Sequence, residues 1–313
     1  MEIIPSLSES PLSSRGGAIA IGVFDGVHLG HRSLLNRAFR IAEEIKGPKV
    51  VFTFGGHPLS VVAPESVPPA LSSPALRRVI FADLGADFVL EEPFTAELSK
   101  MSAEDFLRKL QSFLAPKVIV VGENFTFGEG GRGTPEYLLS RGEEMGFRGE
   151  NVPLFRFADE TVSSTRIRRL LASGDVKTAA LLLGRPFEIR GKVIHGEARG
   201  RTLGFPTANL ALPKEYACPA TGVYATNVVL EDGSSRMAVT NIGKNPTFGG
   251  VTNRVEAHIL DFAGDLYEKE ITVKFAHRLR GEKRFPTAKA LAKQIREDEK
   301  TARKLLQKAN GGD

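Results

Sequence analysis

A chain of 313 residues with 42% hydrophobic residues, 25% charged residues and a net charge of +5 has the composition of a globular protein, and its length favours two domains. The single cysteine, Cys218, excludes an internal disulfide framework and a cysteine-rich zinc site, which suits a reducing cytosol and predicts a cytoplasmic protein. No segment approaches the roughly 18–20 apolar residues of a membrane span, and residues 1–17 lack the basic start and apolar middle of a signal peptide.

Strands and helices alternate in the prediction for residues 1–184. Short apolar runs predict the strands, and apolar residues at helical spacing predict the helices. This alternation indicates βαβ units and a parallel, doubly wound sheet. The expected strands are 18–23, 49–54, 88–90 and 118–121, and the expected helices are 31–46, 74–84, 103–114 and 135–145.

Three motifs come directly after predicted strands of this sheet. They begin at Gly22, at Phe54 and at Gly122. Ligands of doubly wound sheets bind beyond the carboxyl ends of the strands. We therefore expect the three motifs to meet on one rim.

The first motif carries two histidines and three glycines where a strand passes into a helix. Glycines there let a ligand approach the backbone, and the first turn of a helix offers unpaired N–H groups to an anion. His28 and His31 can donate hydrogen bonds to phosphate oxygens. Two turn histidines packed on neighbouring side chains are the alternative, but the spacing H-x-G-H behind F-D-G favours a nucleotide-binding site. The other predicted nucleotide-binding residues of this turn are Gly22, Phe24, Asp25, Gly26 and Gly30.

The other two rim motifs are less specific. Residues 53–58, T-F-G-G-H-P, are as compatible with a simple turn as with a site. In 122–128, G-E-N-F-T-F-G, Asn124 offers a donor and an acceptor, and Phe125 or Phe127 could lie against a planar ring, although at least one of them is expected in the core.

A further motif, S-S-T-R-I-R at 163–168, places hydroxyl groups ahead of a basic helix. One of the serines could simply cap the helix. The same hydroxyls with Arg168 would also make a phosphate clamp, so Ser164, Thr165 and Arg168 are predicted to bind nucleotide.

After residue 184 the sequence changes to short segments in which apolar and polar residues alternate. These segments predict a small antiparallel barrel or sandwich, followed by a helix with Thr287 as its N-cap.

The second half of the chain is the more basic one. Residues 185–313 carry 22 Lys/Arg and 15 Asp/Glu, whereas residues 1–184 carry 20 Lys/Arg and 22 Asp/Glu. The basic residues come singly, so phosphate-bearing small molecules are preferred to nucleic acid as partners. The expected strands are 187–194, 222–230, 237–242, 255–260 and 271–279, with turns that include 232–233, Asn245-Pro246 and 263–265, and the expected helix is 287–308.

This second half has its own set of candidate residues. Glycines in 191–201 predict a loop that closes over phosphates, with Gly191, Gly196, Gly200 and Arg201 as its binding residues. Thr207 and Asn209 offer the hard oxygen ligands that suit Mg²⁺ with ATP. Glu256 is a carboxylate on an otherwise apolar strand; it would serve as a general base if it lies on the inner face, and it could equally face solvent.

Taken together, these motifs resemble the prokaryotic bifunctional riboflavin kinase/FMN adenylyltransferase family, also called FAD synthetase. The resemblance runs in order from Ala18 to Arg303. It implies a Rossmann-like nucleotidyltransferase domain at 1–184, followed by a riboflavin kinase β-barrel with a carboxy-terminal helix at 185–313. The motifs are G-x-F-D-G-x-H-x-G-H at 22–31, V-G-E-N-F-x-F-G at 121–128, S-S-T-R-I-R at 163–168, L-L-G-R-P-F at 182–187, G-R-T-L-G-F-P-T-A-N-L at 200–210, N-I-G-x-x-P-T-F at 241–248 and L-D-F-x-G-D-L-Y at 260–267.

The resemblance implies a role for each matching residue. His28 and His31 would hold the phosphates of ATP and stabilise the adenylyl group as it passes to FMN. Asn124 would contact phosphate or FMN, and the hydroxyls and arginine of 163–168 would hold the triphosphate. In the second domain Thr207 and Asn209 would organise Mg²⁺ with ATP, and Glu256 would take the proton of the riboflavin 5′-hydroxyl.

The chain departs from the family at Gly55-Gly56, where relatives carry a bulkier turn before His57, so His57 is left out of the predicted catalytic set. Two other functions are weighed against the bifunctional enzyme: a flavin-binding module without turnover, and a nucleic-acid enzyme with an H-x-G-H signature. The expected partners are ATP, riboflavin and FMN, with flavin-requiring apoproteins as possible recipients and with no nucleic acid or membrane.

Overall fold

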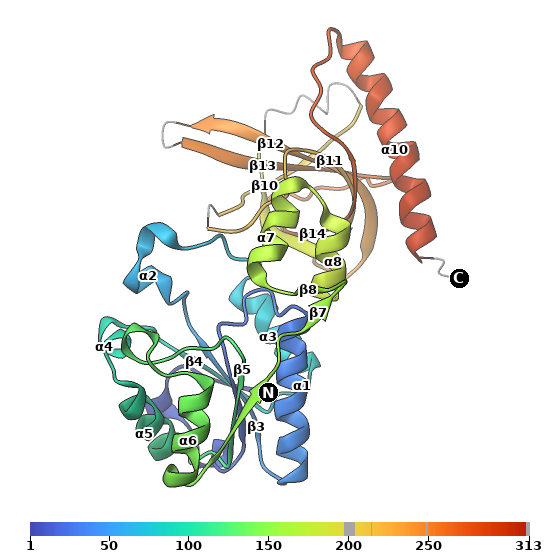
Figure 1. Cartoon of the computed structure of the whole chain (residues 1–313). Coiled ribbons are helices and arrows are strands. Elements are labelled where there is room, and N and C mark those ends of the chain that lie inside the picture. The colour runs from blue at the N-terminus through green and yellow to red at the C-terminus, as the bar shows by residue number, and fades with distance from the viewer. Residues whose placement is uncertain (197–203, 214, 248–249, 311–313) are drawn as a thin grey trace. The chain divides into compact units, whose positions relative to one another are not determined.

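The computed structural model describes residues 1–196, 204–213, 215–247 and 250–310, and the chain divides into two compact units, Met1–Ser164 and Thr165–Asp313 (Figure 1). Helices α7 (Ser164–Ser173) and α8 (Val176–Leu183) therefore group with the second unit. The boundary between two catalytic domains, predicted after residue 184, stays a proposal. Among the described residues no helix combines the length and the apolar character needed to cross a membrane.

The first unit is built on a six-stranded parallel sheet with the strand order β1-β4-β3-β2-β5-β6. Its strands are β1 (Glu2–Ile4), β2 (Ala18–Ile21), β3 (Lys49–Phe54), β4 (Phe88–Glu92), β5 (Val118–Gly122) and β6 (Arg148–Val152). Its longer helices are α1 (Leu29–Glu44), α3 (Pro74–Asp83), α5 (Ala103–Leu114) and α6 (Pro135–Met145), and its short ones are α2 (Leu59–Val62), α4 (Ala96–Ser99), η1 (Leu7–Glu9), η2 (Leu12–Ser14), η3 (Pro64–Ser66) and η4 (Glu129–Gly131). A two-stranded hairpin of β7 (Arg156–Phe157) and β8 (Glu160–Thr161) follows the sheet.

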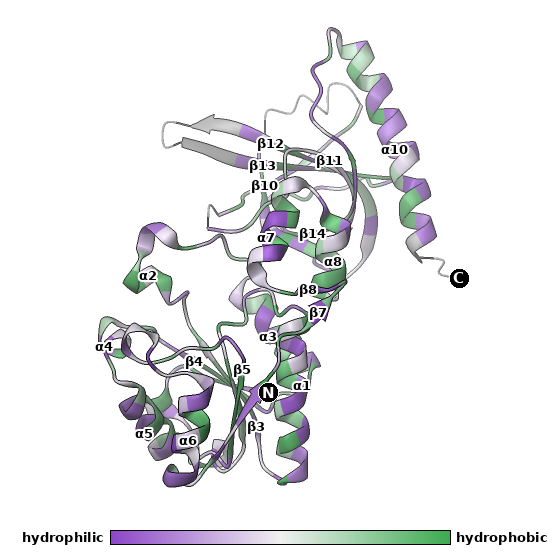
Figure 2. Cartoon of the chain, viewed as in Figure 1, coloured by the Kyte–Doolittle hydropathy of each residue, from purple (hydrophilic) through white to green (hydrophobic). Residues whose placement is uncertain are grey.

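The central strands are apolar along their whole length because both faces of the sheet are covered. In β2, Ile19 and Ile21 join the core that α5 covers, whereas Ala18 and Ala20 join the core that α1 and α3 cover. Figure 2 shows these strands as apolar ribbons between amphipathic helices. The predicted doubly wound α/β fold is confirmed.

The second unit is a closed antiparallel barrel with the strand order β10-β13-β12-β11-β14-β9. Its strands are β9 (Phe187–Ile194), β10 (Ala208–Leu210), β11 (Gly222–Val229), β12 (Ser235–Thr247), β13 (Gly250–Ile259) and β14 (Glu270–Arg280). Of the two predicted architectures, barrel and sandwich, the barrel is therefore the observed one. The turn predicted at Asn245-Pro246 is wrong, because β12 continues to Thr247 and pairs there with β13.

Helices cover the barrel from outside. The guanidinium of Arg278 in β14 donates to the carbonyls of Ser173 and Thr221, at 2.9 and 3.0 Å, and so ties the end of α7 to the barrel. Helix α10 (Ala288–Asn310) begins as predicted after Thr287, whose hydroxyl oxygen accepts from the amide of Ala290 at 3.2 Å. Ala302 and Leu306 of α10 are fully buried against the barrel strands.

Candidate active sites

The turn between β2 and α1 places His28 and His31 against each other. His28 is the N-cap of α1, because its Nδ1 accepts from the amide of His31 at 3.3 Å. Its Nε2 therefore carries the ring proton in the neutral form. The two imidazoles stack with 3.6 Å between ring centroids and 17° between planes. One histidine thus caps the helix and the other lies in its first turn, where N–H groups attract anions.

The surroundings of His31 favour its neutral form. Removal from water holds the pKa of His31 well below its usual value, and the positive charges of His28 and Arg77 lower this pKa further. Nδ1 of His31 is buried and has no hydrogen-bond partner among the described residues. The ring meets Phe24 edge to face, with 5.3 Å between centroids. At neutral pH His31 is therefore an uncharged hydrogen-bonding group in a fixed orientation.

The turn itself is strained. Phe24 and Val27 have positive φ angles of 52° and 39°, which are unusual for side chains of their size. Gly22 and Gly30 are needed for packing: a Cβ on Gly22 would lie 3.0 Å from the ring of Phe24, and a Cβ on Gly30 would lie 3.2 Å from the ring of His28. These two glycines therefore make room for the side chains that shape the turn.

Asp25 and Gly26 use their polar groups to hold the turn against a second segment. The carboxylate of Asp25 accepts from the amide of Leu71 at 2.9 and 3.1 Å and from the hydroxyl of Ser72 at 3.4 Å. The amide of Gly26 donates to the Ser72 hydroxyl at 2.9 Å. Nearby, the guanidinium of Arg77 donates to the carbonyl of Val23 at 3.2 Å. Ser72 and Arg77 belong to none of the predicted motifs, and they lie more than forty residues beyond the turn in the sequence.

Replacing Asp25 with alanine is expected to lower the rate of any reaction at this turn at least tenfold. The amide of Leu71 would lose its buried partner, which costs about 1–3 kcal/mol, and the turn would no longer be fixed. The reaction that the family resemblance implies is adenylyl transfer to FMN, and chromatography of the flavins measures its rate. Asp87→Ala is the matched control, because Asp87 also accepts a backbone N–H, from Lys49 at 2.9 Å, but at the opposite ends of the strands. Equal losses in both variants would contradict a specific role for Asp25.

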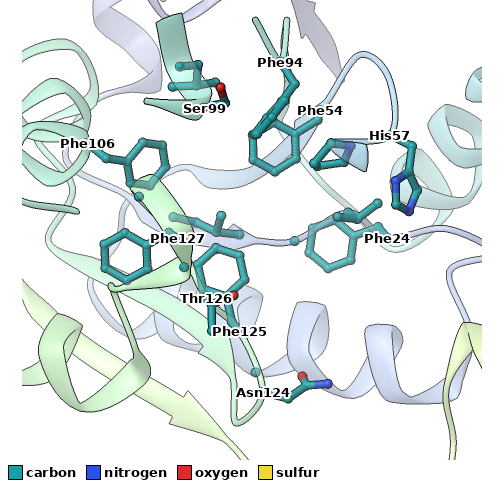
Figure 3. Close-up of a pocket in the computed structure, with 18 of the residues that line it drawn as sticks. Phe24, Phe54, His57, Phe94, Ser99, Phe106, Asn124, Phe125, Thr126 and Phe127 are labelled. Atoms are coloured by element: carbon teal, nitrogen blue, oxygen red, sulfur yellow. The ribbon is translucent and has the colours of Figure 1, made fainter. Parts of the chain in front are cut away.

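An aromatic cavity of about 600 Å³ opens beside the histidine turn. Residues of all three predicted rim motifs line it, including Gly22, His57 and Asn124, so the expected rim is confirmed. Figure 3 shows the phenylalanines that surround the cavity. They are Phe24, Phe54, Phe94, Phe106, Phe125 and Phe127.

The cavity separates the roles of the residues in the motif at 122–128. Phe127 is buried in the core, whereas Phe125 is half-buried and stacks on it with 5.8 Å between centroids. Asn124 is exposed at the rim. His57 lines the same cavity, and its Nδ1 accepts from the amide of Leu59 at 3.1 Å.

Of the predicted triphosphate-binding residues, Ser164 reaches the turn. Its hydroxyl donates to the carbonyl of Asp25 at 2.9 Å. Thr165 and Arg168 follow in α7, which groups with the second unit, so the clamp that they would form with His28 stays a prediction.

In the barrel, Glu256 lies between two asparagines on neighbouring strands. The register places it directly opposite Asn209 of β10 and opposite Asn241 of β12. Its neighbours Val255 and Ala257 are fully buried in the barrel, so Glu256 points to the outer face. The inner-face interpretation of Glu256 is therefore wrong. Its side chain is still only 21% exposed, with the Arg254 guanidinium 3.5 Å away.

The loop predicted to start at Gly191 starts later, because Gly191 lies within β9 and pairs there with Ile271 of β14. Both Gly191 and Gly196 make close approaches to other residues. A Cβ on Gly196 would lie 2.6 Å from Cγ of Asn209, and a Cβ on Gly191 would lie 2.7 Å from the carbonyl oxygen of Ala211. Gly196 therefore leaves a cradle for the carboxamide of Asn209. The predicted phosphate-binding residues Gly200 and Arg201 lie outside the described residues.

Thr207 lines a second cavity, of about 590 Å³, together with interior barrel residues and the loop after β13. The structure thus brings Asn209 and Glu256 side by side and places Thr207 at this cavity. Asn241 lies beside Asn209 and Glu256. It was not predicted as a site residue, although it begins the motif N-I-G-x-x-P-T-F at 241–248.

Replacing Gly196 with alanine is expected to displace the Asn209 side chain. If Asn209 binds Mg²⁺ with ATP, as the family resemblance implies, the Mg²⁺ concentration that half-saturates riboflavin phosphorylation should rise about tenfold. Stability should change little, because a flexible side chain rather than backbone gives way. Gly281→Ala is the control, since a Cβ there meets nothing within 4 Å. An unchanged Mg²⁺ requirement in the Gly196 variant would contradict the role of Asn209.

Comparison with known proteins covers almost the whole chain. Residues 10–166 match the family described as FAD synthetase, and residues 183–306 match the family described as Riboflavin kinase. Curated relatives named "Bifunctional riboflavin kinase/FMN adenylyltransferase" are 37% identical in Escherichia coli (strain K12), over 97% of this chain and 96% of the relative, and 39% identical in Pseudomonas fluorescens, over 97% and 98%. The chain belongs to the bifunctional riboflavin kinase/FMN adenylyltransferase family. The Bacillus subtilis member is 35% identical over 91% of this chain and 90% of its own length.

A solved structure described as a macrolide-efflux protein from Streptococcus pneumoniae is also similar. It has a TM-score of 0.88 and 32% identity, and the match covers 96% of this chain and 98% of that one. The predicted family, the α/β-plus-barrel fold and the pairing of an FMN adenylyltransferase with a riboflavin kinase are confirmed.

Proposed function

We propose that the histidine turn is where this bifunctional enzyme transfers the adenylyl group of ATP to FMN. The stacked pair of His28 and His31 at the start of α1, beside an aromatic cavity, carries the proposal. A phosphate oxygen of FMN attacks the α-phosphorus of ATP, the bond to the β-phosphate breaks, and pyrophosphate leaves. Because the substrate supplies the nucleophile, the residues act by positioning and by stabilising charge.

The imidazoles of His28 and His31 would donate hydrogen bonds to the phosphates of ATP. As the family resemblance implies, Ser164, Thr165 and Arg168 would also bind the triphosphate, and Asn124 would contact phosphate or FMN at the rim. The aromatic cavity would take the flavin ring, which is planar and largely apolar.

We also propose that the outer face of the barrel phosphorylates riboflavin. Glu256 would take the proton of the ribityl 5′-hydroxyl while that oxygen attacks the γ-phosphorus of ATP and ADP leaves. The half-buried position of Glu256 between Asn209 and Asn241 supports this.

The residues around Asn209 fit a magnesium ion bound with ATP. The carboxamide oxygen of Asn209 and the hydroxyl of Thr207 are the hard oxygen ligands that Mg²⁺ prefers, and Gly196 leaves the cradle in which the carboxamide lies. With only two protein oxygens proposed, ATP phosphates and water would complete the coordination. Such an ion would neutralise the charge of the phosphates.

We place the enzyme in the cytoplasm, with flavin-requiring apoproteins as recipients of its products. One lone cysteine suits a reducing compartment. Burial raises the pKa of the Cys218 thiol to about 12, so it stays protonated there.

One experiment tests the proposed function. The purified protein is given riboflavin, ATP and Mg²⁺, and the flavins are separated by chromatography. FMN and FAD should both appear, from two active sites. Flavin that binds but stays unconverted would instead support a binding module, and salt-sensitive RNA binding would revive the nucleic-acid enzyme.

A further inference from the structure

We infer that His258 is a positioning residue of the kinase site, which ties the segment that carries Thr207 to helix α10. The inference rests on the proposed function of Thr207 and Asn209 as magnesium ligands. Neither His258 nor its partner Glu299 was selected from the sequence.

His258 bridges two segments that are far apart in the chain. It lies two residues after Glu256 in β13, on the same outer face of the barrel. Its Nδ1 is 2.7 Å from the carbonyl oxygen of Pro206, and its Nε2 is 2.9 Å from a carboxylate oxygen of Glu299 in α10. The carbonyl of Pro206 can only accept, so Nδ1 donates to it, while Nε2 lies against the Glu299 carboxylate. Phe205 packs edge to face on the ring, with 5.6 Å between centroids.

The hydrogen bond from His258 to Pro206 holds a segment of backbone that the hydrogen bonds of strand β10 do not hold. Strand β10 begins at Ala208, so Pro206 and Thr207 lie outside the ladder that joins β10 to its neighbours. Proline has no N–H, so its carbonyl is the only backbone group by which it can be held. The His258 bond therefore fixes the backbone directly before Thr207 and sets the direction in which the Thr207 hydroxyl is presented.

Helix α10 does not need His258 for its own attachment. Asp298 is buried and accepts from the guanidinium of Arg280 at 2.8–3.2 Å, and Arg303 pairs with Asp261 at 2.5 and 2.8 Å. Apolar contacts of Ala302 and Leu306 add to these bonds. The Glu299 carboxylate thus serves chiefly to orient the His258 ring.

The test compares variants that remove one or both of the two hydrogen bonds of His258. His258→Ala removes both bonds, and His258→Asn keeps a donor near the position of Nδ1 but loses Glu299. Glu299→Ala frees the ring. Gln294→Ala is the matched control, because it removes a hydrogen bond of the same helix, from the Gln294 carboxamide to Asp298 at 3.1 Å, without touching His258 or Glu299. Two quantities are measured in the full-length protein: the Mg²⁺ concentration that half-saturates riboflavin phosphorylation, and hydrogen exchange of residues 204–210 without ligand.

We expect His258→Ala to raise the half-saturating Mg²⁺ concentration about tenfold, the equivalent of one hydrogen bond, and to speed exchange of 204–210 by a similar factor. His258→Asn should recover most of both losses, and Glu299→Ala should add nothing on top of His258→Ala. Adenylyl transfer to FMN should stay unchanged in all variants.

Two results would overturn the inference: unchanged exchange and Mg²⁺ dependence in His258→Ala, or an equal loss in Gln294→Ala. Failure of the proposed function is distinguished by Thr207→Ala. If that variant leaves the Mg²⁺ requirement unchanged while His258→Ala still speeds exchange of 204–210, then the bridge positions the segment and the ligand assignment is what fails.

Discussion

Replacing His28 or His31 with alanine is expected to abolish FAD formation from FMN and to leave FMN formation from riboflavin intact. Each imidazole would supply a hydrogen bond to charge that develops in adenylyl transfer, and removal of one such donor typically lowers kcat by about 10²–10³. The residues proposed for the kinase reaction lie in the barrel, in the other compact unit. Chromatography of the flavins formed from riboflavin and, separately, from FMN measures both steps on one preparation.

His28 needs a second variant because it also caps α1. Loss of the cap alone costs about 1 kcal/mol, so a poorly folded His28→Ala protein would be ambiguous. Asparagine is a good N-cap, and His28→Asn should keep the stability of the parent yet be as inactive as His28→Ala in FAD formation. A His28→Asn protein with full adenylyltransferase activity would show that His28 serves only as a cap.

The sequence predicts the architecture well wherever local patterns decide it. Strands such as Ala18–Ile21 are apolar throughout because both faces are covered, and this made the parallel sheet predictable. Strand β6 was missed because its residues, R-G-E-N-V, are mostly polar at the edge of the sheet. Strand β10 has only three residues, too few for a periodic signal. Asn245-Pro246 is typical of a turn, but in the structure it lies within β12, near the end of its pairing with β13. Proline is compatible with the end of a hairpin.

Contacts between distant segments could not be predicted. Asp25 was selected as a nucleotide ligand from its motif, but only the folded chain shows that its carboxylate holds Leu71 and Ser72. Periodicity left open which face of β13 carries Glu256, and the buried neighbours settle it as the outer one. A pattern thus predicts candidate residues, whereas the partners of each residue depend on the tertiary structure.

Replacing Glu256 with glutamine is expected to lower kcat for riboflavin phosphorylation by about 10²–10⁴, the usual contribution of a general base, with little change in KM. Glutamine keeps the size and the hydrogen-bonding reach of the side chain between Asn209 and Asn241 but cannot take a proton. The conversion of FMN to FAD should be unaffected. Glu270→Gln is the control, because Glu270 is a carboxylate of β14 in the same barrel, paired with Arg190 at 2.7 Å.

The pattern of the loss decides which role Glu256 has. A group that acts only in the transition state lowers kcat and kcat/KM together, whereas a group that binds the ground state raises KM. A Glu256→Gln enzyme whose kcat recovers at high Mg²⁺ would make Glu256 a magnesium ligand, because added metal cannot replace a missing base. A kcat that stays within about tenfold of the parent, below the usual contribution of a general base, would remove Glu256 from the reaction. A loss of kcat that Mg²⁺ cannot restore would place proton removal on the outer face of the barrel, at the row formed by Asn209, Glu256 and Asn241.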